Sequence, residues 1–282
     1  MIPIAYITQW RQFAPWIDNA QVEQDLILSR VIVDLFSDPF LRQELAFRGG
    51  TALNKLFFKP AARYSEDIDL VRTSTGAITD IIDALRSRLD PWLGEPQRER
   101  KENGFKLRYI FNPEGSPNIK QKIKIEINTR ECFTVYDRIL EPFSVNSSWF
   151  SGESLVNTYQ LEELMATKLR ALYQRKKGRD LFDLWFALQN DSLDSEKIIH
   201  AFQHYMNQEN KSITRELFEL NLDQKLETSF FMEDINILLS PDLKNKTSVS
   251  TEGNWNMFNA AQLVKNKLLV KLPPSISKSA KK

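Results

Sequence analysis

The stretch LAFRGGTALNKLFFKPAARYSEDIDLV, residues 45–71, indicates how the first part of the chain folds. It begins with a short apolar run that stops at Gly49-Gly50, and a helical stretch follows from Thr51 and ends at Pro60. A strand, a glycine turn and a helix in this order direct backbone N–H groups and a helix N-terminus at one point. We therefore predict that Gly49, Gly50 and Thr51 cradle phosphate groups. A plain strand-to-helix turn is the alternative interpretation.

The same stretch ends in a pair of acids, Asp67 and Asp69, in a predicted strand. Side chains alternate along a strand, so an extended segment would place both acids on one face with Arg63 and Ser65. Two carboxylates at this spacing repel each other unless a cation lies between them, and Mg²⁺ or Mn²⁺ prefers such oxygen ligands. An Asp-x-Asp pair is a weak signal by itself, but the glycine turn before it strengthens it. We expect a divalent-metal site here, with Arg63 and Ser65 contacting the nucleotide.

A third acid, Glu126, is predicted to lie on a neighbouring strand. Residues 104–111 and 120–129 alternate with a period of two around a turn rich in Pro, Gly and Asn, which predicts an antiparallel hairpin. The isoleucines of the second strand take one face, and Glu126 shares the other with Lys122 and Lys124. A carboxylate at this place could complete a metal site. An exposed acid beside two lysines on a solvated face is the alternative.

The remaining pattern predicts an α+β chain with a mixed, at least partly antiparallel sheet. Residues 21–37 and 75–89 are typical of helices, each ended by an Asp-Pro pair. Residues 142–158 suggest a loop with one short strand, and helical periodicity dominates from Tyr159 onward.

We accordingly expect three regions along the chain: a mixed α/β domain over 1–155, a helical domain over 156–272 and a disordered basic tail over 273–282. A polar loop is predicted at 241–254. From residue 253 onward the chain has six lysines and no acid. Because the whole chain has a formal net charge of +1, the remaining residues carry a net charge of −5. The tail is thus either a solvated terminus or a contact for RNA or an acidic partner.

Lys168 lies within the apolar stripe of the helix predicted at 159–173. A partly buried lysine needs an anionic partner, and a nucleotide triphosphate would serve; a lysine whose stem simply covers the core is the alternative. In the next helix Asp180 and Asp183 share a face, and Arg179 can pair with Asp183. Five cations between residues 170 and 179 suit either phosphates or solvent.

Composition excludes several other classes of protein. The chain has 282 residues, 42% of them hydrophobic, and is typical of a folded globular protein. Cys132 is the only cysteine and the only histidines are His200 and His204, so an intramolecular disulfide is excluded and a zinc enzyme is disfavoured. No segment has the ~18 uninterrupted apolar residues of a membrane span, and the N-terminus lacks the pattern of a signal peptide. We expect a cytoplasmic protein.

Four motifs in order resemble those of the AbiEii/AbiGii family of nucleotidyltransferase-like toxins, within the DNA polymerase β-type nucleotidyltransferase superfamily. They are residues 47–53 (FRGGTAL) with Arg63-x-Ser65-x-Asp67-Ile68-Asp69-Leu70, then Ile125-Glu126-Ile127, then Glu163-x-x-x-x-Lys168, and finally Arg179-Asp180-x-x-Asp183. The resemblance implies a nucleotidyltransferase N-domain and a helical C-domain, with Asp67 and Asp69 as Mg²⁺ ligands. Glu126 would be a possible third ligand.

The resemblance also implies an activity. NTP would be the substrate, and Lys168, Asp180 and Asp183 would complete the active site. Lys168 would support the triphosphate, and any of Glu126, Asp180 and Asp183 could accept the proton or bind metal. The acceptor would be tRNA or another RNA, and a separately encoded antitoxin would inhibit the toxin in a system of abortive phage infection. Transfer to a small molecule or a protein hydroxyl, and a non-catalytic binding module, are the alternatives.

Overall fold

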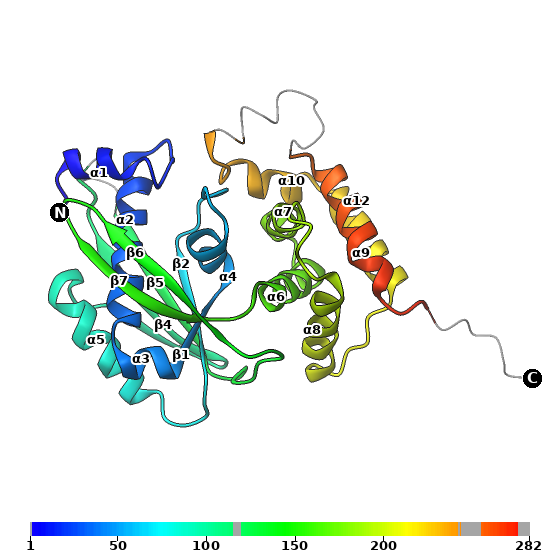
Figure 1. Cartoon of the computed structure of the whole chain (residues 1–282), viewed down its shortest axis with the longest axis horizontal. Helices are drawn as coiled ribbons and strands as arrows, with labels where there is room; N and C mark the ends of the chain where they lie inside the picture. The colour runs from blue at the N-terminus through cyan, green and yellow to red at the C-terminus, as the bar shows by residue number, and fades with distance from the viewer. Residues whose placement is uncertain (1, 115–119, 242, 244–254, 276–282) are drawn as a thin grey trace, which may run out of the picture. The chain divides into compact units, whose positions relative to one another are not determined.

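The computed structural model describes residues 2–114, 120–241, 243 and 255–275 (Figure 1). The chain divides into two compact units, Met1–Gln160 and Leu161–Lys282. The first unit combines a sheet with helices, and the second is built of helices. The polar loop predicted at 241–254 and the tail predicted beyond 272 lie mostly outside the described residues.

The first unit contains a seven-stranded sheet with the order β3-β4-β5-β2-β1-β7-β6. Parallel pairs join β2 to β5 and β1 to β7, and the other neighbours are antiparallel. The sheet is therefore mixed, which confirms the predicted fold class. The strands are β1 (Leu45–Arg48), β2 (Asp67–Arg72), β3 (Gln97–Lys101), β4 (Gly104–Phe111), β5 (Gln121–Asn128), β6 (Ile139–Asn146) and β7 (Ser151–Thr158).

The predicted pairing of β4 and β5 is confirmed. The two strands are antiparallel, with Tyr109 opposite Ile123 and Leu107 opposite Ile125. These four side chains are fully buried, whereas their neighbours along each strand are more exposed. Alternation of buried and polar side chains sets the register, because a slip of one residue would expose the whole apolar set.

The prediction of a loop with one short strand over 142–158 is wrong. β6 and β7 form an antiparallel hairpin there, and β7 pairs with β1 through Thr158 and Phe47. Most side chains of the hairpin are exposed or half-buried, so the local sequence lacks the expected hydrophobic alternation. Its strands are held by backbone pairing to each other and to a strand about a hundred residues earlier. Pro142 is compatible with this arrangement because β6 is an edge strand.

Helices pack on the sheet of the first unit: α1 (Ile4–Trp10), α2 (Asn19–Phe36), α3 (Pro39–Glu44), α4 (Gly49–Ala52) with the π-helical turn η1 (Leu53–Phe57), and α5 (Thr79–Leu93). α2 contacts β5, β6 and β7, and α4 contacts β1 and β2.

The helix predicted to close at Asp90-Pro91 continues to Leu93. Pro91 lies in the last turn, where its missing N–H removes only one helical hydrogen bond. Gly94 then ends the helix with a φ of 79°, a conformation that favours glycine.

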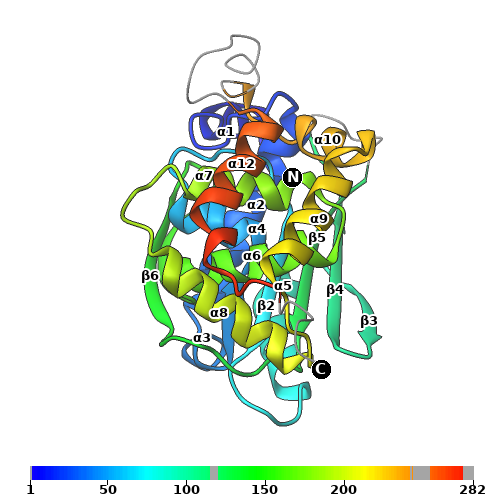
Figure 2. The ribbon, with the colours of Figure 1, turned by 90° about the vertical axis from the view of Figure 1, so that its right-hand side faces the viewer.

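The second unit consists of α6 (Leu161–Gln174), α7 (Gly178–Ala187), α8 (Ser195–Gln208), α9 (Arg215–Leu226), α10 (Ser229–Asn236), α12 (Met257–Lys267) and η2 (Leu269–Lys271) (Figure 2). α7 contacts α6, α10 and α12. Trp255 packs edge-on against Phe182 and Trp185 of α7, with ring centroids 5.0 and 5.2 Å apart. Among the described residues, no helix combines the length and apolar character that crossing a membrane requires.

Candidate active site

The glycine turn lies directly against the acids of β2. β1 ends at Arg48 and α4 begins at Gly49, whose φ is 84°. A Cβ atom added at Gly49 would lie 2.3 Å from Oδ2 of Asp69, and one added at Gly50 would lie 2.3 Å from a guanidinium nitrogen of Arg63. Glycine is therefore required at both positions for the carboxylate and the guanidinium to approach the turn so closely.

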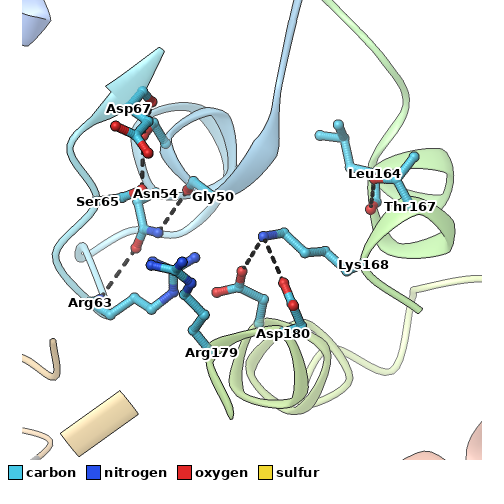
Figure 3. Close-up of polar contacts among 12 residues, drawn as sticks. Gly50, Asn54, Arg63, Ser65, Asp67, Leu164, Thr167, Lys168, Arg179 and Asp180 are labelled. Carbon is cyan, nitrogen blue, oxygen red and sulfur yellow. Dashed lines mark hydrogen bonds and ion pairs between the residues drawn. The ribbon is translucent and has the colours of Figure 1, made fainter. Parts of the chain in front are cut away.

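Polar contacts tie this turn to the start of β2 (Figure 3). Thr51 Oγ1 lies 2.8 Å from Ser65 Oγ and donates a hydrogen bond to the backbone carbonyl of Asp67. Asn54 Nδ2 donates to the carbonyl of Gly50 at 2.9 Å, and Asn54 Oδ1 accepts from the amide of Arg63 at 3.3 Å. Asn54 was missed in the sequence, although a polar residue one helical turn after Gly50 was a usable signal.

Arg63 and Ser65 do not lie within the strand that carries the acids. β2 begins at Asp67, so the alternation that placed all four side chains on one strand face does not extend to them. Arg63 is 2% exposed and also donates from Nη1 to the carbonyl of Tyr64 at 3.1 Å. The structure still brings Arg63 and Ser65 to the glycine turn, through the contacts with Gly50 and Thr51 rather than through strand periodicity.

Asp67 and Asp69 face residues of β5 in parallel register. Asp69 is aligned with Glu126, and Asp67 is aligned with Lys124. The third acid thus lies on the strand beside the pair. Its direct partners are cations, since Lys106 Nζ and Lys124 Nζ lie 2.8 and 3.1 Å from Glu126 Oε1.

Lys124 bridges two of the acids, because its Nζ also lies 2.6 Å from Asp67 Oδ2. Partial burial opposes ionisation of Glu126, but hydrogen bonds from Lys106 and Lys124 outweigh it and lower the pKa of this carboxyl. Burial likewise opposes the charge on Lys124, and the contacts with Asp67 and Glu126 outweigh it and raise the pKa of Lys124. Both shifts favour the charged forms of Glu126 and Lys124. Neither Lys106 nor Lys124 was singled out as a functional residue from the sequence.

The donor set is compatible with a divalent cation at Asp67 and Asp69. In the described part of the chain, no three acidic, histidine or cysteine side chains converge as a metal-binding group. Asp67 and Asp69 present carboxylate oxygens of the kind that Mg²⁺ prefers, beside a glycine turn. Glu126 is directed to the two lysines and would need a different side-chain position to join them.

A small cavity of about 180 Å³ opens beside these acids within the first unit. Most of its polar lining is charged, and the charges of both signs come from five strands, one residue from each: Arg48, Asp69, Lys101, Lys106 and Glu126. Arg48 is held by Glu131, with Nη1 2.6 Å from Oε2. A pocket with this combination of cations and acids suits a metal-bound anion such as a phosphate.

The second unit holds the other predicted residues in a buried network (Figure 3). Lys168 Nζ of α6 lies 2.8 Å from Asp183 Oδ2 and 3.5 Å from Asp180 Oδ1 of α7. Both acids are fully buried, and the Lys168 side chain is 8% exposed. Arg175 also binds Asp180 with two hydrogen bonds of 2.7 and 2.8 Å. The anionic partners of Lys168 in this unit are thus these two acids.

Another acid of the predicted motifs, Glu163 on α6, is also fully buried and accepts a hydrogen bond of 2.8 Å from the hydroxyl of Tyr205 on α8. His200 and His204 lie on the same helix as Tyr205. Within the described residues they belong to no group of three metal-binding side chains.

Comparisons with known proteins identify the family. No curated protein matches the sequence. Among solved structures, the chain is similar to MenT4, a nucleotidyltransferase toxin from Mycobacterium tuberculosis H37Rv, with 15% identity and a TM-score of 0.58 over 94% of this chain and 99% of that one. It is also similar to JHP933 from Helicobacter pylori, with 16% identity and a TM-score of 0.51 over 88% and 89% of the two chains. A profile of the nucleotidyl transferase AbiEii toxins of type IV toxin–antitoxin systems matches residues 30–262. The chain therefore belongs to the AbiEii nucleotidyl transferase toxin family.

Proposed function

We propose that this protein transfers a nucleoside monophosphate from an NTP to tRNA in a reaction that depends on Mg²⁺ or Mn²⁺, and thereby acts as the toxin of its pair. The observation that carries the proposal is the contact between the glycine turn and Asp69, in a chain of the AbiEii family. Two carboxylates beside a helix start that lacks a side-chain cap suit a metal-bound triphosphate.

Asp67 and Asp69 would hold the cation, which neutralises charge on the triphosphate and on the leaving pyrophosphate. The turn at Gly49 and Gly50 supplies backbone N–H donors, since α4 begins there without a side-chain cap. Thr51 and Ser65 keep the turn against β2 through their mutual hydrogen bond. These residues place the α-phosphate for in-line attack by an acceptor hydroxyl.

Lys124 holds the acids together before a divalent cation arrives. Its ammonium bridges Asp67 and Glu126 and so reduces their mutual repulsion. If Asp67 held a divalent cation, its carboxylate would have to give up this ammonium, and the cation would supply the positive charge in its place. Release of Lys124 would leave Glu126 paired with Lys106 alone, and a change of its side-chain position would then let it bind metal or accept the proton of the acceptor.

The catalytic roles of Lys168, Asp180 and Asp183 stay a prediction. What supports them is their place in the third and fourth motifs. The ion pairs within the second unit support a further role, in which the two acids hold the Lys168 ammonium in one position. Lys168 would then be a fixed cation rather than a flexible surface lysine.

The partners follow from the same proposal. A cognate antitoxin, encoded separately, would block the toxin, as the type IV toxin–antitoxin family implies. The cytoplasm is the compartment in which NTP, tRNA and such an antitoxin meet. The pocket lining has three cations, Arg48, Lys101 and Lys106, and two acids, and this excess of positive charge favours a polyanionic acceptor over a cationic small molecule.

The key experiment incubates the protein with each of four labelled NTPs and total cell RNA in Mg²⁺. We expect one nucleotide to be incorporated into the tRNA fraction by the wild-type protein and by Asp137→Ala, which removes an exposed acid of the first unit. Asp69→Asn keeps the size of the side chain but weakens the metal site, and it should lose incorporation. Full activity of Asp69→Asn would overturn the metal assignment. Label found only in small molecules or protein would overturn the choice of tRNA.

A further inference from the structure

A second cavity of the first unit, about 640 Å³, lies beside the carboxylate pocket. It is bounded by the edge strand β3, by the start of β4 and by the first turn of α5. Three residues line both cavities: Lys101, Gly104 and Phe105. The two spaces therefore adjoin at the β3–β4 turn. We call the larger one the arginine groove, after its lining residues Arg72, Arg98 and Arg100.

Arg98 and Arg100 are exposed, and their side chains are not engaged in ion pairs, unlike that of Glu99 between them. Arg98 and Arg100 alternate along β3 with Glu99 and Lys101, so the strand period places them together on one face. On the other face Glu99 accepts a hydrogen bond of 2.8 Å from Arg108. Neither the Arg98 nor the Arg100 side chain makes a hydrogen bond or an ion pair with any part of the chain that the structure describes. Their guanidinium groups are available to a ligand.

Arg72 forms the floor of the groove and is only 5% exposed. It donates to the carbonyl of Gly76, and its other terminal nitrogen lies 3.9 Å from Oε2 of Glu44. Its Nε is buried and has no hydrogen-bond partner among the described residues. A buried cation with a free donor is stabilised by an anion at the groove.

The rest of the lining adds further donors. Thr79 begins α5, a helix of 15 residues whose N-cap residue, Ile78, provides no side-chain cap. The free amides and positive dipole of this first turn favour an anion. Two acids, Asp83 and Glu102, also line the groove. Glu102 already forms an ion pair of 2.8 Å with Arg130, and Asp83 is exposed. The four cations Arg72, Arg98, Arg100 and Lys101 outnumber them.

We propose that the arginine groove binds the phosphodiester backbone of a single-stranded segment of the acceptor RNA and directs its terminal hydroxyl to the adjoining carboxylate pocket. This inference rests on the proposed function. Residues two apart on a strand lie about 6.6 Å apart along it, and a guanidinium group can bind a phosphate bidentately. Phe105, half-buried at the junction of the two cavities, can stack on a base.

An acidic protein surface is the main competing ligand for such a groove. Nucleic acid is favoured because the groove adjoins the pocket where an acceptor must present its hydroxyl, and because an aromatic ring lies at the junction. A protein partner that only covers the cations would need neither feature.

The test measures binding of a fluorescein-labelled single-stranded RNA oligonucleotide to the full chain by fluorescence anisotropy, at several salt concentrations and without NTP. We expect Arg98→Ala/Arg100→Ala to weaken binding about tenfold. The slope of log K against log salt concentration should become less steep by about 1.4, because two phosphate contacts of a single strand are lost. Arg98→Lys/Arg100→Lys keeps both charges but loses the bidentate contacts, so its affinity should lie between that of the wild type and that of the alanine variant. Arg88→Ala, which removes an exposed arginine of α5 outside both cavities, should bind as the wild type does.

Unchanged affinity and slope in Arg98→Ala/Arg100→Ala would overturn the proposal. Binding of labelled polyglutamate to the same variants is measured as well. If Arg98→Ala/Arg100→Ala loses binding to polyglutamate but keeps its affinity for RNA, the groove belongs to an acidic protein and the proposal is overturned. The thermal shift of the wild-type protein with Mg²⁺ and each NTP is measured in parallel. A protein that shows the nucleotide shift but no groove-dependent RNA binding refutes this inference alone, whereas absence of the shift counts against the proposed nucleotidyl transfer.

Discussion

Replacing Lys168 with methionine tests the buried ion-pair network of the second unit. The substitution keeps most of the unbranched stem that packs in α6 but removes the ammonium 2.8 Å from Asp183. Asp180 keeps the two hydrogen bonds from Arg175, so the removal of the ammonium mainly affects the carboxylate of Asp183. Asp183 is fully buried, and its charge cannot be solvated without movement of α7.

The size of the effect follows from burial. Breaking a buried ion pair by removing one partner costs about 3–5 kcal/mol, and the lower end applies here because Asp180 remains paired with Arg175. A loss of about 3 kcal/mol in the opening free energy of α6 and α7 makes their amides exchange roughly a hundredfold faster. The double variant Lys168→Met/Asp183→Asn removes the charge of both partners and should recover part of this loss.

Hydrogen exchange followed by mass spectrometry measures the effect locally. Peptides from α6 and α7 should exchange faster in Lys168→Met, and peptides from β1 and β2 serve as an internal reference. Lys176→Met removes an exposed lysine between the same two helices and should change nothing. Wild-type exchange rates in α6 and α7 of Lys168→Met, or equal acceleration in β1 and β2, would refute the reasoning.

Three further predictions concern the acids, the glycine turn and pH. Lys124→Met should bind Mn²⁺ several-fold more tightly, since a cation that competes for the Asp67 carboxylate is gone; weaker binding by electron paramagnetic resonance contradicts this. Gly49→Ala should lose Mn²⁺ binding while its circular dichroism spectrum stays native. The new Cβ would collide with Asp69, and the φ of 84° costs a non-glycine residue about 1–2 kcal/mol. Intact Mn²⁺ binding would contradict the role given to the glycine turn. Burial lowers the pKa of Lys225 to about 8, so between that pH and its ordinary value of about 10.4 the unfolded chain holds a proton that the folded chain has lost. Stability, measured as the urea midpoint, should therefore rise with pH across this window, and Lys225→Met should lack the rise.

Local sequence was sufficient for several parts of this protein. The strand, glycine turn and helix around Gly49 follow from residue types that leave the backbone few choices. The pairing of β4 with β5 and the mainly helical second half follow from periodicity, which reports burial within one element. The acid pair at Asp67 and Asp69 needed only the two-residue period of a strand.

The tertiary structure alone decided which groups meet. Asp69 and Glu126 are 57 positions apart in the sequence, and they face each other because β2 and β5 pair in parallel in one register. The same register places Lys124 between two acids. β6 and β7 were missed because their strands depend on backbone pairing with a distant partner and bury few side chains.

Lys168 shows the same division most clearly. Its place in an apolar stripe predicted a buried ammonium that needs an anion, and the helical period could go no further than that. Only the packing of α6 on α7 identifies Asp180 and Asp183 as the partners within this unit. Burial is set by the period of one helix, whereas the distance between two charges depends on how two helices pack. The sequence therefore determined which side chains are polar and inward-facing, and the tertiary structure determined the distances at which their charges interact.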